Sequence, residues 1–301
     1  MSSKYWKLGI VGWPLGYSLS PLMHTAALKA AGLEGEYKEY PVKPEDLDRW
    51  LREEAPKLDG FNVTMPHKKS VLMWEIDRRL EGKPGIQQKV KGTKVIGVVN
   101  TVVMKEGRPV GHNTDGGGFL SVLTERGFNP SGWRTLLFGA GGAAEAIATA
   151  FTLETEVKLI TIWNRHRDRA EEVARWVKNR QEHEGSQVKT QVAEDLLSLS
   201  IRDYDLLVNA TPTGMNGEGD FLVDFNQLHS GQVVYDLVYQ PRETKLIQEA
   251  RKRGCTVITG DEMLAAQGAL SFELWTGVKA DKVVPVMRKA LDEYYGRGSS
   301  G

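Results

Sequence analysis

The chain has 301 residues, of which 41% are hydrophobic and 26% are charged. These shares match the averages of globular proteins and exclude a disordered, fibrous or repeat-dominated chain. Lys plus Arg and Asp plus Glu each number 39, so no basic excess exists to attract a phosphate backbone, and we expect no nucleic-acid partner. The length favours about two domains of roughly 150 residues each.

Cysteine usage and hydropathy bear on the compartment. The single cysteine, Cys255, has no second thiol in the chain with which to form a disulfide. With no secretory signal at the start, we expect a cytoplasmic protein. No run approaches the roughly 18 to 20 apolar residues of a membrane helix, so we expect no membrane partner. Residues 297–301 are expected to form a flexible tail.

The first part of the chain alternates short apolar runs with helical patterns, which predicts a parallel sheet. Predicted strands cover residues 7–12, 36–42 and 60–64, and predicted helices cover residues 20–31, 44–54 and a segment opening after Pro66. Ser20 and Pro21 favour a helix start, with Ser20 as N-cap and the proline in the first turn.

A local antiparallel pair is predicted next. The runs 95–104 and 109–112 flank the turn signal Glu106-Gly107, which is typical of a hairpin. Residues 80–94, rich in Lys and Gly, are interpreted as a surface insertion without a role in the chemistry.

A second α/β series follows a helix predicted at residues 115–126. Its predicted strands cover 134–138, 157–163, 188–192, 206–209, 233–238 and 256–258, with helices at 141–153 and 169–181 and two more after Gly260. The fold class is therefore α/β: a first α/β domain over residues 1–114, joined by the closing helices at about 262–296, and a Rossmann-like doubly wound domain over residues 115–261.

A glycine-rich turn follows the strand predicted at 134–138, and its residues match the pattern G-x-G-x-x-A: Gly139, Ala140, Gly141, Gly142, Ala143 and Ala144. Gly139 suits a tight turn, Gly141 lets the backbone approach a pyrophosphate, and Ala144 allows close packing of helix on strand. The free N–H groups of the following helix would face the phosphates. The alternative is a purely structural turn.

The end of the next strand bears on the choice of dinucleotide. An NAD site usually has an acidic residue about 20 positions after the glycines, but here Asn164 and Arg165 follow the strand. Arg165 and Arg169 are candidates to pair with the 2′-phosphate of NADP, since guanidinium matches phosphate well. The alternative is a solvated basic helix start.

Three polar residues in the first domain or at its boundary are unusual for a core. Lys68 comes shortly after a strand, at the edge where open α/β sheets bind ligands. Asn100 lies in an apolar run, and Asp115 lies in a glycine-rich loop. A lysine and an aspartate at one site would hold each other charged and position a substrate hydroxyl for proton exchange. Taken alone, Lys68 is equally well interpreted as a surface residue.

Six blocks of the chain together resemble a known family. In chain order they are Ser18-Leu19-Ser20-Pro21-Leu22-Met23-His24, Asn62-Val63-Thr64-Met65-Pro66-His67-Lys68, Val99-Asn100-Thr101, Asn113-Thr114-Asp115-Gly116, Gly139-Ala140-Gly141-Gly142-Ala143 and Gln267-Gly268. This set is similar to shikimate dehydrogenase and runs over nearly the whole chain.

The resemblance implies a reversible NADP-linked reduction of 3-dehydroshikimate to shikimate, a step toward chorismate and the aromatic amino acids. It implies that Lys68 and Asp115 form the catalytic pair. The substrate-binding residues that it implies are Ser18, Ser20 and Tyr239 for the carboxylate, and Thr64, Asn100, Asp115 and Gln267 for the ring hydroxyls. The further cofactor-binding residues that it implies are Thr211, Met215, Val238 and Gly260.

Some features depart from the family pattern, and alternatives stay open. Tyr17 and Thr25 stand where the family often has His and Asn, so the mouth of the carboxylate site is expected to differ in shape. The six histidines are scattered without metal-ligand spacing, and we expect no metal. The alternatives are a broader quinate/shikimate dehydrogenase, one that uses NAD, and a non-catalytic metabolite sensor. We expect a small-molecule substrate and a monomer or homodimer.

Overall fold

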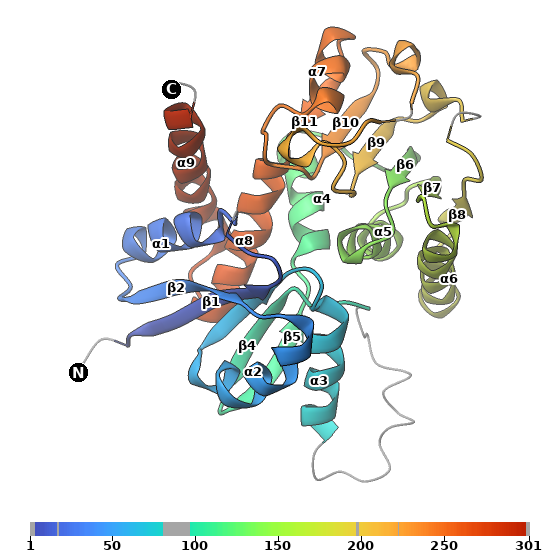
Figure 1. The fold of residues 1–301 in the computed structure, drawn as a ribbon. Coiled ribbons are helices and arrows are strands. Elements are labelled where there is room, and N and C mark those ends of the chain that lie inside the picture. The colour runs from blue at the N-terminus through green and yellow to red at the C-terminus, as the bar shows by residue number, and fades with distance from the viewer. Residues whose placement is uncertain (1–3, 17, 81–96, 197–198, 222, 299–301) are drawn as a thin grey trace. The chain divides into compact units, whose positions relative to one another are not determined.

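The structure is a computed structural model of the chain, and it describes residues 4–16, 18–80, 97–196, 199–221 and 223–298. The chain divides into two compact units, Met1–Gly117 with Ala265–Gly301 and Gly118–Leu264, which are described separately (Figure 1). Most of the expected surface insertion at 80–94 lies outside the described residues, as do Tyr17 and the end of the expected tail.

The first unit is built on a mixed five-stranded sheet with the order β2-β1-β3-β4-β5. Its strands are β1 (Trp6–Gly12), β2 (Gly35–Pro41), β3 (Gly60–Val63), β4 (Thr101–Lys105) and β5 (Arg108–His112). Strands β1, β2 and β3 run parallel, as predicted, whereas β4 and β5 are antiparallel. The predicted hairpin is present, with Glu106 and Gly107 both at positive φ, as a tight two-residue turn requires.

The strand predicted at 95–104 begins only at Thr101. Residues 97–100 are irregular, although the Asn100 carbonyl still accepts the Val63 N–H at 2.8 Å. Periodicity predicted too long a strand here because apolar side chains also line this buried loop. The irregular backbone leaves the side chain of Asn100 at the edge of the sheet.

Helices cover both faces of this sheet (Figure 1). They are α1 (Ser20–Ala30), α2 (Leu47–Glu53), α3 (Lys68–Leu80), α8 (Gly260–Thr276) and α9 (Ala280–Gly298). Successive strand residues face opposite sides, so Phe61 and Val63 join the apolar cluster with Trp50 of α2. Asn62 between them hydrogen-bonds to Ser271 of α8 instead.

The start of helix α1 differs from the prediction. Ser20 is the first helical residue, Leu19 is the N-cap, and no side chain caps the helix. The Ser18 hydroxyl accepts the Ser20 backbone N–H at 3.3 Å. Ser20 is therefore not the cap, and its side chain hydrogen-bonds to Tyr37 instead.

The second unit is built on six parallel strands in the order β11-β10-β9-β6-β7-β8. The strands are β6 (Arg134–Phe138), β7 (Leu159–Trp163), β8 (Lys189–Val192), β9 (Leu206–Asn209), β10 (Val233–Asp236) and β11 (Thr256–Ile258). Counted from β6, this is the 3-2-1-4-5-6 order of the doubly wound dinucleotide fold. The predicted fold class is confirmed.

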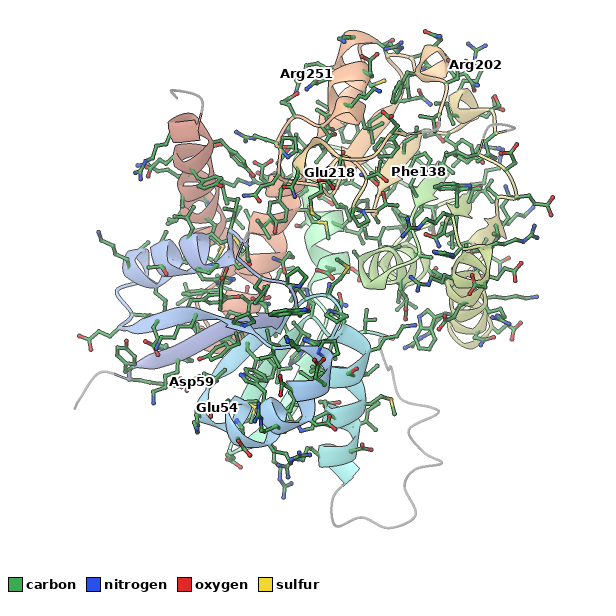
Figure 2. All side chains as sticks on the ribbon, viewed as in Figure 1. Glu54, Asp59, Phe138, Arg202, Glu218 and Arg251 are labelled. Carbon is green, nitrogen blue, oxygen red and sulfur yellow. The ribbon has the colours of Figure 1, made fainter. Side chains whose placement is uncertain are left out.

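Both faces of this sheet are packed. The helices are α4 (Asp115–Glu125), α5 (Gly142–Glu154), α6 (Arg167–Glu184) and α7 (Lys245–Lys252). Phe119 of α4 stacks on Tyr235 with ring centroids 4.5 Å apart and meets Phe151 of α5 edge-on. On the other face, Phe138 joins the apolar cluster that includes Leu246 of α7, and Figure 2 shows Phe138 among the side chains of this unit. Among the described helices, none is long and apolar enough to cross a membrane.

Gly60 allows α8 to lie close against the first sheet. A Cβ atom at Gly60 would collide with the Trp275 ring and come within 2.7 Å of the Val102 carbonyl oxygen, to which the Trp275 indole donates at 2.9 Å. We expect Gly60→Ala to lower the free energy of unfolding by about 1–3 kcal/mol through overpacking. Gly296→Ala, in α9 with open space around it, should raise it by up to about 1 kcal/mol. Urea denaturation measures both, and equal effects would contradict this packing.

Candidate active site

One edge of the first sheet collects its polar side chains. Strands β1 and β3 end at this edge, β4 begins there and β5 ends there. Thr64 follows β3 and donates its N–H to the Val11 carbonyl at 2.9 Å. Because chain direction fixes which strand ends meet, residues far apart in sequence are brought together here.

An ion pair joins Lys68 and Asp115 at this edge. The Lys68 Nζ lies 2.5 Å from Asp115 Oδ2, and the two side chains are only 16% and 9% exposed. Each residue is the first of its helix, α3 and α4. The Asp115 N–H donates to Asn113 Oδ1 at 2.9 Å, and a helix N-terminus favours a carboxylate. The structure thus brings the predicted catalytic pair together.

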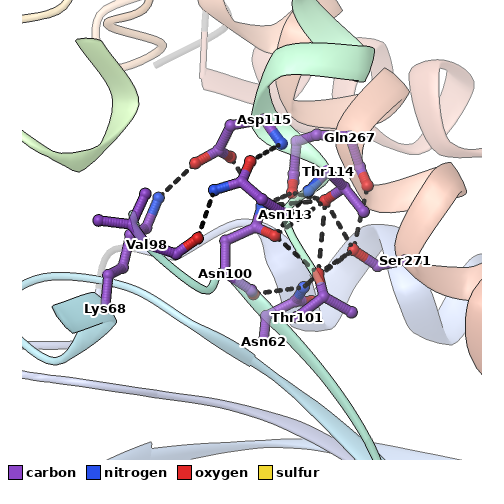
Figure 3. A network of polar contacts seen from close by, with 10 residues as sticks. All are labelled: Asn62, Lys68, Val98, Asn100, Thr101, Asn113, Thr114, Asp115, Gln267 and Ser271. Carbon is purple, nitrogen blue, oxygen red and sulfur yellow. Dashed lines mark hydrogen bonds and ion pairs between the residues drawn. The ribbon is translucent and has the colours of Figure 1, made fainter. Parts of the chain in front are cut away.

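Asn100 holds the other oxygen of Asp115 (Figure 3). Its Nδ2 donates to Asp115 Oδ1 at 2.8 Å and to Thr114 Oγ1 at 2.9 Å. Its Oδ1 accepts the Thr114 N–H at 2.8 Å. Both ends of the amide are therefore occupied, which fixes its orientation and makes Asn100 a positioning residue for the carboxylate.

The buried hydroxyl groups of Thr101, Thr114 and Ser271 form a hydrogen-bonded cluster next to Asn100 (Figure 3). Thr101 Oγ1 lies 3.0 Å from Asn100 Oδ1 and 2.8 Å from Ser271 Oγ. Thr114 Oγ1 lies 3.1 Å from Ser271 Oγ. Ser271 was not among the residues predicted from the sequence. Its position one helical turn after Gln267, on the same face of α8, is the signal that could have identified it.

The remaining predicted substrate residues are distributed as follows. Ser20 is buried and Ser18 is half-buried at the start of α1. Gln267 Oε1 lies 3.4 Å from Asn100 Nδ2 and from Thr114 Oγ1, so it borders the same network. Tyr239, half-buried, belongs to the second unit. His67 is buried and its Nε2 lies 2.7 Å from the Val42 carbonyl oxygen, a structural contact.

The glycine-rich turn after β6 has the geometry of a phosphate cradle. Gly139 has a φ of +109°, and a Cβ there would lie 2.7 Å from the Ala210 carbonyl oxygen. A Cβ on Gly141 would meet nothing within 4 Å, and Gly141 caps α5 without any side-chain hydrogen bond. The first N–H groups of a helix lack partners within the helix. This turn therefore fits a pyrophosphate, with Ala140, Gly142 and Ala143 completing it.

The arginines after β7 differ in their partners. Arg167 pairs with Glu171 at 2.8 Å and with Glu194 at 3.0 Å. Arg165 and Arg169 are exposed, and within the described residues neither has an ion pair. Asn164 donates to the His166 carbonyl at 2.8 Å, which shapes the turn. Two guanidinium groups next to the cradle are thus free to meet a phosphate.

A second polar network lies where β9 and β10 end. Asp236 is fully buried and accepts hydrogen bonds from Asn209, Val238 and Thr244. Burial raises the pKa of its carboxyl from 3.8 to about 6, and those hydrogen bonds oppose the rise. Of these four residues, Val238 alone was predicted from the sequence to bind the cofactor.

The other predicted cofactor residues adjoin this second network. A Cβ on Gly260 would lie 2.5 Å from the Leu237 carbonyl oxygen and 2.6 Å from that of Val238. Thr211 hydrogen-bonds to Asn209, and Met215 follows in the same loop. The residues expected to bind the dinucleotide thus follow the carboxyl ends of β6, β7, β9, β10 and β11.

Comparisons with known proteins define the class of protein. The shikimate dehydrogenase substrate binding domain matches residues 10–78, and the shikimate 5′-dehydrogenase C-terminal domain matches residues 260–291. "Shikimate dehydrogenase (NADP(+))" of Methanopyrus kandleri is 43% identical over 295 residues, covering 95% of each chain. The chain belongs to the shikimate dehydrogenase family, which confirms the resemblance drawn from its motifs.

Two solved structures show the same fold over nearly the full length. A shikimate dehydrogenase in complex with NADP+ superposes with a TM-score of 0.79 at 32% identity, covering 96% of this chain and 95% of the other. The ligand-free 5-ketofructose reductase of Gluconobacter sp. strain CHM43 superposes with a TM-score of 0.78 at 31% identity, covering 97% and 99%. Relatives with this fold therefore differ in substrate.

The arginines provide a test of the phosphate site. We expect Arg165→Ala to weaken NADPH binding about tenfold or more while NADH binding changes little, because only NADPH has the 2′-phosphate that a charge-assisted hydrogen bond would recognise. Arg167→Ala removes the same charge from an arginine already paired with two glutamates, so it should have a much smaller effect. Fluorescence titration measures all four affinities. A uniform loss for both cofactors in Arg165→Ala would contradict the assignment.

Proposed function

We propose that this chain catalyses the reversible NADPH-dependent reduction of 3-dehydroshikimate to shikimate. The Lys68–Asp115 ion pair is the observation that carries the proposal, because it pairs a proton donor with a carboxylate at a polar sheet edge. In this proposal the first unit binds the substrate and the second binds NADP(H). The chain's membership of the shikimate dehydrogenase family supports both assignments.

The polar edge of the first unit suits a small acid that carries several hydroxyl groups. Ser18 and Ser20 stand at the N-terminus of α1, where hydroxyl donors and the helix dipole favour a carboxylate. Thr64, directly after β3, and Gln267, which borders Asn100 and Thr114, would bind ring hydroxyls. Tyr239 is the further residue proposed to bind the carboxylate.

When bound at the glycine turn and Arg165, NADPH would supply the hydride that reduces the ketone carbon of the substrate. As the carbonyl oxygen becomes an alkoxide, the Lys68 ammonium group stabilises its charge and donates the proton that completes the hydroxyl. Asp115 holds the ammonium group in place through Oδ2, and Asn100 holds Asp115 through Oδ1. In the reverse direction Lys68 accepts the proton of the substrate hydroxyl.

The proposal includes the surroundings of the enzyme. We expect it to act on small molecules in the cytosol, as a monomer or a homodimer. The thiol of Cys255 is buried and contacts the His229 carbonyl at 3.2 Å. Burial raises the pKa of this thiol, which suits a structural cysteine in a reducing compartment.

The proposed function is tested by the rate of NADPH oxidation with 3-dehydroshikimate, measured beside 3-dehydroquinate and beside NADH. We expect rapid turnover only with 3-dehydroshikimate and NADPH. Comparable rates with 3-dehydroquinate or NADH would place the chain among the broader quinate/shikimate enzymes. Binding of NADPH without turnover of either substrate would overturn the catalytic assignment and favour a metabolite sensor.

The role of Lys68 is tested by Lys68→Ala. We expect kcat to fall by about 10²- to 10⁴-fold, as for other positioned acids, while shikimate binding weakens much less, because the ammonium group acts mainly on the developing charge. Lys69→Ala removes the same charge from the exposed neighbouring side chain and should leave kcat nearly unchanged. Steady-state kinetics and equilibrium binding give both quantities, and equal losses in turnover and binding would contradict the role.

A further inference from the structure

Asp236 is a buried carboxylate that the proposed mechanism does not use. It ends strand β10 and is 0% exposed. Its Oδ1 accepts Asn209 Nδ2 at 2.7 Å and the Val238 N–H at 3.0 Å, and its Oδ2 accepts the Thr244 hydroxyl at 2.6 Å. All three donors are neutral. A carboxylate is an acceptor-only group, so it fixes the direction in which each neighbour donates.

Asn209 connects the Asp236 carboxylate to the loop after β9. Because its Nδ2 is drawn toward Asp236, its Oδ1 faces the other way and accepts the Thr211 N–H at 3.0 Å and the Thr211 hydroxyl at 2.6 Å. The same Nδ2 also donates to the Thr213 carbonyl at 3.1 Å. Every hydrogen-bonding direction of this buried amide is therefore used, and rotating it would break all of these bonds.

Two loops are thereby fixed together. Residues 211–215 depend on Asp236 through Asn209, and residues 237–240 depend on it directly through Val238. The Asn216 N–H donates to the Gln240 carbonyl at 2.8 Å and joins the two segments. The Thr244 hydroxyl also accepts the Ile247 N–H, so the carboxylate is anchored to the start of α7.

The doubly wound sheet indicates which half of a dinucleotide these loops would meet. The pyrophosphate belongs at the turn after β6 and the adenosine ribose at the end of β7. The other half of the dinucleotide then lies on the opposite side of the switch point, over the ends of β9 and β10. Thr211, Met215 and Val238 stand there, whereas Arg165 stands at the end of β7.

We propose that Asp236 is a positioning residue that orders, through Asn209 and the Val238 N–H, the two loops that bind the nicotinamide half of the cofactor. This inference rests on the proposed binding of NADP. In the described residues, the glycine turn and Arg165 have no hydrogen bond to Asp236. A change at Asp236 should therefore weaken the binding of the nicotinamide half without weakening the binding of the adenosine half.

The test compares NADP+ with 2′-phospho-ADP-ribose, which has the adenosine, the 2′-phosphate and the pyrophosphate but no nicotinamide. Asp236→Leu keeps a similar side-chain size and removes both acceptor oxygens. We expect it to weaken NADP+ binding about tenfold or more and to leave the affinity for 2′-phospho-ADP-ribose within about twofold. Calorimetric titration measures both affinities without turnover.

Two further variants keep the test decisive. Asp236→Asn retains one oxygen for Asn209 and Val238, and its new amide group can donate to the Thr244 hydroxyl, so most of the NADP+ affinity should return. Asn209→Leu breaks the bonds to Thr211 and Thr213 but leaves Asp236 its bonds to Val238 and Thr244. It should give the same selective loss, which makes the proposal testable if Asp236→Leu does not fold. Combining Asn209→Leu with Asp236→Leu should cost less than the sum of the single effects.

A matched control is Thr135→Val in β6 of the same unit. Thr135 is fully buried and its hydroxyl has no hydrogen-bond partner in the described residues, so both affinities should stay unchanged. Equal loss of both ligands in Asp236→Leu and Asn209→Leu, or no loss of NADP+ in either, would overturn the positioning role. Failure of the wild-type chain to bind either ligand would instead overturn the proposed cofactor.

Discussion

The ion pair between Lys68 and Asp115 determines the arrangement of the rest of the polar edge. Removing two charges from water is costly unless each is paired and hydrogen-bonded, and these side chains are only 16% and 9% exposed. Lys68 occupies one carboxylate oxygen of Asp115, so the other must meet a donor. Asn100 supplies that donor, and its own amide oxygen must then find donors in Thr114 and Thr101.

The need of each buried polar group for a hydrogen-bond partner extends the network from Asn100 into the sheet. Asn62 on β3 and Thr101 on β4 are cross-strand partners, so their side chains share one face. That face meets α8, where Ser271 closes the network. Gly60 and Trp275 set how near α8 lies to this face. The position of Lys68 thus depends on packing that involves Gly60 on the sheet and the Trp275 indole on α8.

Much of this architecture could be predicted from the sequence because it depends on local signals. The strands at 134–138, 206–209 and 256–258 have the bounds that their apolar runs predicted, and the Glu106-Gly107 turn formed the expected hairpin. The motifs indicated Lys68 and Asp115, which the structure brings together. The prediction of Ser20 as N-cap was wrong because it relied on residue type, while the backbone turns one residue earlier at Leu19.

Other features could not be predicted, because they depend on contacts across long stretches of chain. Ser271 and Asn62 are 209 positions apart, so the helical spacing that places Ser271 near Gln267 could not show that its hydroxyl meets Asn62. Asp236 lies in a strand pattern that predicted only burial. Its partners Asn209 and Thr244 come from another strand and from a helix start, so its role exists only once β9, β10 and α7 have come together.

The two buried aspartates show why charge and geometry must be considered separately. Asp115 has a cation beside it, whereas Asp236 has only neutral donors, and burial raises its pKa to about 6. Because the folded pKa lies above the ordinary 3.8, the contribution of Asp236 to stability is greatest below that value and is lost as pH rises through about 6. At neutral pH the charged carboxylate therefore opposes folding relative to its protonated form. The charged carboxylate instead fixes the orientation of its neighbours. Because it can only accept hydrogen bonds, the Asn209 amide, the Val238 N–H and the Thr244 hydroxyl must all point toward it. These hydrogen bonds order the loops after β9 and β10.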